Sequence, residues 1–252
     1  MITSLKSELR KLLTIRSTYF ITGFVLLFVA FLSIYVFGYQ QASQPASSPL
    51  YTADVLYNML GTFVTFGVII AILHVAHEYR YNTINYTLTL TTSRLKVLAS
   101  KVIVLLGYAT IMGAVTLTIA YFGSRLGLDI KNVTLAPQQF DFAEIAWQYI
   151  AYTWGYVLAG IILAVLIRGL VGSIVAFFMI PTLEGILSLI LKTNTKYLPF
   201  RSLDAIAATP NPAPIAQGIE VLSHTAALGV FTIYLAVFGG LAVFAFLKRD
   251  AS

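Results

Sequence analysis

The stretch IAWQYIAYTWGYVLAGIILAVLI, residues 145–167, contains no Asp, Glu, Lys or Arg. A helix needs roughly 20 apolar residues to cross the hydrocarbon core of a bilayer, so this stretch is long enough to span a membrane. Four other stretches are equally free of charged residues, and a fifth, 173–191, is interrupted only by Glu184. We therefore predict an all-α membrane protein with six transmembrane helices, near residues 18–39, 55–77, 102–123, 145–167, 173–191 and 225–247.

The composition supports the same class. Of the 252 residues, 58 % are hydrophobic and only 10 % are charged, and the mean hydropathy is +0.84. So few charged side chains cannot cover the surface of a soluble globule of this size. The apolar runs are continuous and do not alternate, which favours helices over a transmembrane barrel. Cysteine is absent from the sequence, so no disulfide or thiolate metal site is expected.

The distribution of basic residues predicts the orientation, because Lys and Arg accumulate on the cytoplasmic side of membrane proteins. With both termini in the cytoplasm of a multi-pass protein of the cell inner (plasma) membrane, the outer loops hold few basic residues: Arg125, Lys131, Lys192, Lys196 and Arg201. The cytoplasmic segments hold most of them: Lys6, Arg10, Lys11, Arg16, Arg80, Arg94, Lys96, Lys101, Arg168, Lys248 and Arg249. The net charge of +6 then reflects topology, and no nucleic acid partner is expected.

Two segments outside the spans have a pattern of their own. Within residues 1–17, leucines recur at helical spacing and basic residues occupy the other side, which predicts an amphipathic helix in the inner interface. A short basic tail that only fixes topology is the alternative. Residues 193–224 form a semi-apolar outer loop, in which short helices interrupted by prolines are expected.

The polar segment HEYRYNTINYTLTLTTSRLKV, residues 77–97, separates the second and third spans. We expect the second helix to continue to about Tyr81, a turn near Asn82, and a third helix that starts after a Ser93 cap. From spacing alone, two roles stay open for Glu78, Arg80 and Arg94. They bind a partner, or they pair with each other and with lipid phosphates.

This segment resembles a motif of the ABC type-2 permeases, the membrane subunits of ATP-driven exporters. In that family, a Glu-x-Arg-x-Gly-Thr-Ile/Leu run is followed by a Pro-x-Ser-Arg run and a Lys that opens the third helix. Asn replaces the glycine and Thr replaces the proline here, and the matching positions are Glu78, Arg80, Asn82, Thr83, Ile84, Thr91, Ser93, Arg94 and Lys101. The order of segments along the chain also resembles that of this family.

The resemblance implies a single permease domain over residues 1–252, which is not an enzyme and exports an amphipathic substrate such as a peptide, drug or lipid-like molecule. It implies that residues 78–101 form a cytoplasmic coupling loop on an ATP-binding subunit, with a second contact at Arg168. It also implies two ATP-binding subunits and a second permease, identical or related. Because the chain has no Gly-x-x-x-x-Gly-Lys-Ser/Thr loop, ATP and Mg must be bound by the partner, and no cofactor is expected in this chain.

Polar residues within the predicted spans are candidates for a translocation route. Glu184 is the only carboxylate in a span; it lines the route, or it is a hydrogen-bonded structural residue near a helix break at Pro181. Asn58, Thr62 and Thr65 share one helical face, which lines the route or joins helices. An alternative function is a stand-alone secondary carrier or membrane scaffold, with Glu184 as its ion or proton site.

His74, His77 and Glu78 share a helical face, as the ligands of a metal site on a helix do. Their order, H-x-x-H-E, differs from the zinc signatures H-E-x-x-H and H-x-x-E-H. The sequence therefore predicts no metal site, and these side chains are expected at the inner interface of the membrane.

Overall fold

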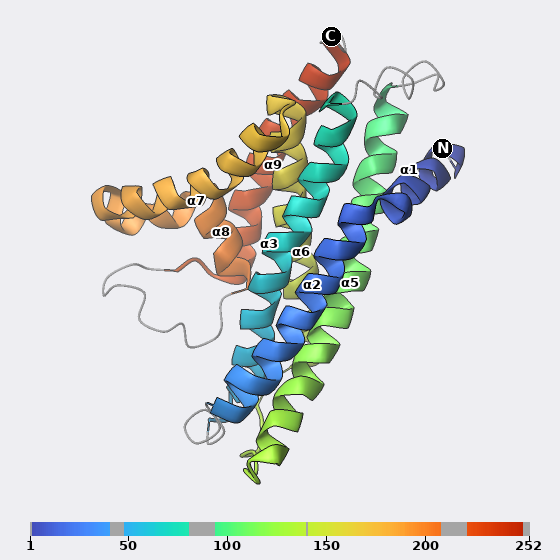
Figure 1. The fold of residues 1–252 in the computed structure, drawn as a ribbon. Coiled ribbons are helices and arrows are strands. Elements are labelled where there is room, and N and C mark those ends of the chain that lie inside the picture. The colour runs from blue at the N-terminus through green and yellow to red at the C-terminus, as the bar shows by residue number, and fades with distance from the viewer. Residues whose placement is uncertain (1, 41–47, 81–93, 140, 208–220, 249–252) are drawn as a thin grey trace.

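The computed structural model describes residues 2–40, 48–80, 94–139, 141–207 and 221–248 (Figure 1). All regular secondary structure in these ranges is helical, and six helical segments are long and apolar enough to cross a membrane. The predicted class, an all-α protein with six membrane-spanning helices, is confirmed.

The described helices come in the following order along the chain. Helix α1 (Ile2–Thr14) precedes the first span, which consists of α2 (Arg16–Phe31) and its π-helical continuation η1 (Leu32–Gln40). The next three spans are α3 (Tyr51–Arg80), α5 (Arg94–Ile130) and α6 (Phe142–Ile167). The chain then continues through α7 (Leu170–Leu191), the 3-10 helix η3 (Lys192–Tyr197), α8 (Pro199–Ile206) and α9 (His224–Lys248).

Several elements extend beyond the uncharged windows from which the spans were predicted. Helix α5 begins at Arg94 and ends at Ile130, so the first turns of the third helix lie inside the predicted 78–101 loop. This happens because helical hydrogen bonding does not stop at the edge of the hydrocarbon, where charged side chains can reach water. Residues 81–93, the centre of that loop, lie outside the described residues.

Helix α3 occupies the centre of the bundle. It packs against α2, α5, α6 and α7, and 67 % of its most apolar stretch is buried, against 11 % for α7. Helix α7 leans away from the other spans (Figure 1). Its many exposed apolar side chains therefore face lipid or another chain in the membrane.

A seam of small residues joins the first span to the third. A Cβ atom added to Gly38 of η1 would lie 2.7 Å from the Cα atom of Gly127 in α5. Ser33 lies at the same seam, where it would be 3.0 Å from a Cβ atom on Gly123. Small residues let two helix backbones approach closely, and van der Waals packing drives helix association within a bilayer. This seam therefore holds η1 against the far half of α5.

Both described chain ends lie at the same end of the bundle (Figure 1). We call this the N/C end. It contains α1, the end of α3 at Arg80, the start of α5 at Arg94, the turn between α6 and α7, and the end of α9 at Lys248. The opposite end contains the start of α3, the end of α5 and the start of α6.

Candidate functional site

Five ionisable side chains from three helices meet at the N/C end. We call them the ionic cluster: Glu8 and Lys11 from α1, His74 and Glu78 from α3, and Lys101 from α5. Lys101 Nζ lies 2.7 Å from Glu8 Oε2 and 2.6 Å from Glu78 Oε1. Lys11 Nζ lies 2.7 Å from Glu8 Oε1 and 2.8 Å from Glu78 Oε1. The cluster thus links α1, α3 and α5 directly.

His74 completes the cluster on the α3 side. Its Nε2 atom lies 3.0 Å from Glu8 Oε2, and the histidine lies one helical turn before Glu78 on the same face. This histidine of the H-x-x-H-E pattern therefore has a carboxylate partner on another helix. In the described ranges, no three His, Cys, Asp or Glu side chains are grouped so that they could hold a metal ion.

The cluster is buried and electrically balanced. Glu8, His74, Glu78 and Lys101 are between 1 % and 6 % exposed, and two carboxylates face two ammonium groups. Burial alone would raise the pKa of Glu8, but hydrogen bonds with His74 and Lys101 and the charge of Lys101 hold that pKa far below its usual value. Such a balanced group tolerates burial, whereas the loss of one member leaves an uncompensated charge.

Lys11 lies at the edge of the cluster, where its side chain is 33 % exposed. Burial would lower the pKa of this ammonium group, but its hydrogen bonds with Glu78 and Glu8 and their charges raise the pKa above its usual value. Two buried polar atoms, Glu78 Oε2 and His74 Nδ1, have no hydrogen-bond partner among the described residues. The cluster therefore keeps some capacity for a bound water or a shifted partner.

Two arginines that sequence analysis assigned to a partner contact bind within the chain. Arg94 Nη1 donates to the carbonyl oxygen of Leu247 at 3.0 Å, which satisfies one of the unpaired carbonyls at the end of α9. Arg168 ends α6 with φ 58°, in the left-handed region, and its guanidinium lies 5.4 Å from the ring centroid of Tyr79. These contacts join α5 to α9 and α6 to α3 at the N/C end.

The remaining predicted contact residues lie at the end of α3 or outside the described residues. Arg80 is the last residue of α3. The others, Asn82, Thr83, Ile84 and Ser93, lie outside the described residues, as does Thr91. The contact role of this segment stays a prediction.

Sequence reasoning missed Glu8 and Lys101 as partners, since they lie far apart in the chain. The sequence contains one signal of the buried position of Glu8. Glu8 falls on the same helical side as Leu5 and Leu12, which places a carboxylate on the stripe that faces the bundle. A charge on an apolar stripe indicates a buried partner.

Among the described residues, the accessible charge at the N/C end is positive. The exposed ionisable side chains there, within the described ranges, are Lys6, Arg10, Arg16, Lys96 and Lys248. The two described carboxylates at this end, Glu8 and Glu78, are buried in the ionic cluster. A partner at this surface therefore meets cations.

Glu184 has a structural partner in α8. Its Oε1 atom accepts a hydrogen bond from the backbone N–H of Phe200 at 3.1 Å, and its Oε2 atom accepts one from the N–H of Arg201 at 3.0 Å. The first N–H groups of a helix lack partners within the helix, and Leu198 at the N-cap offers no side-chain acceptor. Of the two interpretations left open for Glu184, this geometry supports the hydrogen-bonded structural residue. The helix break expected at Pro181 is wrong, because α7 continues through this proline.

Asn58, Thr62 and Thr65 form an outward face on α3. Asn58 is exposed, and the two threonines are half-buried. Each donates to a carbonyl one turn earlier in α3, at 2.7, 3.1 and 3.0 Å, so none of these donor groups joins α3 to another helix. This polar face is open on a single chain, and its role in a translocation route stays a prediction.

Comparison with known protein families gives a match over most of the chain. Residues 4–184 match the family described as "ABC-2 family transporter protein", a range that contains all members of the ionic cluster and the outward face of α3. No curated protein and no solved structure matched the chain.

Proposed function

Since this chain belongs to the ABC-2 transporter family, and is therefore a multi-pass membrane permease of an ABC transporter, we propose that it couples ATP hydrolysis in a separate subunit to export of an amphipathic substrate. The permease would lie in the plasma membrane, with its N/C end facing the cytoplasm. The basic surface of that end supports this orientation, because Lys and Arg accumulate on the cytoplasmic side.

The proposed assembly contains two ATP-binding subunits, which hold ATP and Mg, and two permeases, identical or closely related. Each ATP-binding subunit would contact residues 81–93 and the exposed cations of the N/C end. An acidic groove on that subunit would complement these cations, because the described carboxylates of this end, Glu8 and Glu78, are already paired inside the chain. The outward face of α3 would meet the second permease and line the route between the two copies.

The observation that carries this proposal is the short ion pair between Glu78 and Lys101. Glu78 lies two residues before the end of α3, and Lys101 lies in the second turn of α5, so the pair closes the base of the 81–93 segment at 2.6 Å. A push on this segment would therefore move α3 and α5 together. Glu8 extends the link to α1, so three helices would respond to one contact.

A movement of α3 at the N/C end would be transmitted to the proposed translocation route by α3 itself. Asn58, Thr62 and Thr65 lie on the same continuous helix as Glu78, and a helix transmits a displacement along its axis as a rigid element. A tilt of α3 at the N/C end would change the distance between its outward face and the equivalent face of the second permease.

The test is a reconstitution with the ATP-binding subunit. Lys96→Glu reverses an exposed cation outside the ionic cluster, so it should weaken complex formation and lower permease-dependent ATP hydrolysis while the permease stays folded. Lys131→Glu, a charge reversal at the opposite end, is the matched control and should have no effect. If the two subunits form no complex, or if ATP hydrolysis is independent of the permease, the chain acts without an ATPase and a secondary carrier becomes the better explanation.

A further inference from the structure

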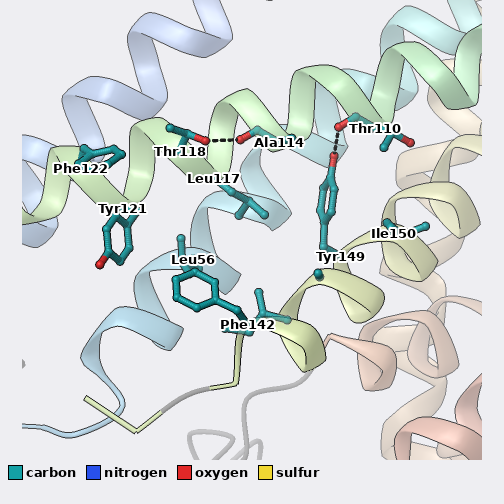
Figure 2. A pocket seen from close by; sticks show the side chains of 12 residues that line it. Leu56, Thr110, Ala114, Leu117, Thr118, Tyr121, Phe122, Phe142, Tyr149 and Ile150 are labelled. Carbon is teal, nitrogen blue, oxygen red and sulfur yellow. Dashed lines mark hydrogen bonds between the residues drawn. The ribbon is translucent and has the colours of Figure 1, made fainter. Parts of the chain in front are cut away.

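An apolar groove runs between α5 and α6 at the end of the bundle opposite the N/C end (Figure 2). It encloses about 530 Å³, and Leu56 of α3 forms part of its floor. Exposed Phe122 and Phe142 lie at its outer end, and Thr110 and Ile150 lie at its inner end.

Three polar side chains of this groove, Thr110, Thr118 and Tyr149, form hydrogen bonds within the protein. Tyr149 donates its hydroxyl hydrogen to the carbonyl oxygens of Ala109 and Thr110, at 2.9 and 2.8 Å. Thr118 donates to the carbonyl oxygen of Ala114 at 2.8 Å, as Figure 2 shows. The groove therefore presents an apolar surface, which suits a hydrocarbon chain.

The length of the groove matches one leaflet of a bilayer. Thr110 and Phe122 lie twelve positions apart on α5, and a rise of 1.5 Å per residue gives a separation of about 18 Å. Half of a typical hydrocarbon core is about 15 Å. An acyl chain that enters at Phe122 would thus follow the groove through its own leaflet.

Arg125 stands at the outer end of the groove. Its guanidinium carbon lies 4.3 Å from the ring centroid of Tyr121, which lines the groove. Its Nε atom is buried without a hydrogen-bond partner, and no described carboxylate forms an ion pair with it. Arg125 ends the uncharged window of α5, which places this guanidinium at the level of the lipid headgroups.

A second hollow of about 550 Å³ adjoins Arg125 on the other side of Phe122. Ile34, Ile119 and Leu126 supply its apolar wall. Asp129 also lines it, but this carboxylate is exposed, one helical turn further from the membrane, where water screens it. Two apolar hollows thus lie beside the ring of Phe122, and Arg125 lies at the headgroup end of both.

We propose that this face binds an anionic phospholipid of the surrounding bilayer. Its phosphate accepts hydrogen bonds from Arg125, one acyl chain occupies the groove between α5 and α6, and the other follows the hollow beside Phe122. Arg125 is only half-buried, so its charged guanidinium can donate to phosphate oxygens, and charge-assisted bonds of this kind are strong. This site is separate from the outward face of α3, and it does not depend on the proposed transport function.

The experiment compares two lipids on the purified full-length protein in detergent. Phosphatidylglycerol and phosphatidylcholine with identical acyl chains are added, lipid retention is measured by native mass spectrometry, and stability is measured as the midpoint of thermal unfolding. We expect phosphatidylglycerol to be retained more strongly and to raise the midpoint further. Arg125→Ala should weaken retention of phosphatidylglycerol about tenfold and remove its advantage over phosphatidylcholine.

Three further variants make the test specific. Arg125→Gln keeps side-chain donors without the charge, and it should lose the preference for the anionic lipid even if Arg125→Ala does not fold. Ala146→Phe, at an exposed position that lines the groove, should reduce retention of both lipids. Lys131→Ala is the matched control, because Lys131 Nζ also lies 4.3 Å from a tyrosine ring centroid, that of Tyr39, but lines neither hollow.

Equal retention of the two lipids by the wild type, or an unchanged preference in Arg125→Gln, would overturn the proposal. So would loss of the lipid preference in Lys131→Ala, since surface charge alone would then explain it. If Ala146→Phe converts a dimer to a monomer, the groove is covered by a second permease and the proposal is wrong.

Discussion

Replacement of Lys101 by Met tests whether the ionic cluster holds the N/C end together. Lys101 is 2 % exposed and donates to two carboxylates on two other helices, at 2.7 Å to Glu8 and 2.6 Å to Glu78. Met has a similar length and no charge. In Lys101→Met, two buried carboxylates would share the single ammonium group of Lys11, so the cluster would carry one uncompensated negative charge.

The expected loss follows from that geometry. Removal of one partner from a buried ion pair lowers stability by about 3–5 kcal/mol, because the remaining charge is left without compensation. Two charge-assisted hydrogen bonds of about 1.5–3 kcal/mol each are lost, which gives a loss of the same order. We therefore expect the free energy of unfolding of Lys101→Met to be about 4 kcal/mol lower than that of the wild type.

The assay is reversible unfolding by SDS in mixed micelles, followed by tryptophan fluorescence. The double variant Lys101→Met with Glu78→Gln restores the balance between Glu8 and Lys11, so it should be about 1–3 kcal/mol more stable than the sum of the two single losses implies. Lys96→Met, an exposed position on the same helix, is the control and should change stability by less than about 0.5 kcal/mol. A loss below about 1 kcal/mol in Lys101→Met, or strict additivity in the double variant, would refute a cooperative cluster.

Three further outcomes are expected from the structure. The folded pKa of Glu8 lies below its usual value of 4.5, so the stabilisation that ionised Glu8 provides is present above pH 4.5 and is lost as the pH falls through and below that value. The difference in unfolding free energy between wild type and Glu8→Gln should therefore be constant from about pH 6 to 9 and should shrink in acid. A difference that is unchanged at about pH 3 would contradict this expectation. Gly127→Ala should destabilise the protein by about 1–3 kcal/mol, because a Cβ there meets the backbone of Gly38, whereas Gly107→Ala, with open space around it on the same helix, should be neutral or stabilising in the same titration. Glu184→Ala removes both acceptors at the start of α8 and should lower stability by about 1–2 kcal/mol while ATP-driven transport per folded molecule is unchanged; normal stability with lost transport would instead assign Glu184 to the route.

The six spans could be predicted because the signal for each is local. An uncharged window such as 145–167 has no alternative to the membrane, whatever the rest of the chain does. The position of α1 against α3 and α5 could not be predicted in the same way. It depends on which side of a short helix is buried, and the leucines around Glu8 fit lipid as well as protein.

The role of Glu184 shows a second limit. Sequence alone gives a carboxylate within an apolar span, and two unrelated needs can retain it there. The distinction rests on α8, whose backbone N–H groups come within hydrogen-bond distance only when the chain returns from η3 toward α7. No local pattern around Glu184 contains that information.

The burial of Glu78 changes the interpretation of the polar segment between the second and third spans. A charged residue next to a docking segment suggests a surface contact, yet this carboxylate is bonded to Lys101 and Lys11 and is largely hidden from solvent. A contact that transmits force needs a rigid base as well as a surface that binds the partner, because helix ends that fray locally would absorb the displacement. In the proposed assembly, Glu78 and Lys101 would supply that base, and recognition of the ATP-binding subunit would fall to residues 81–93 and to exposed cations such as Lys96. On this argument, Glu78→Gln should reduce the coupling between ATP hydrolysis and transport more than the affinity between the subunits, and Lys96→Glu should do the reverse.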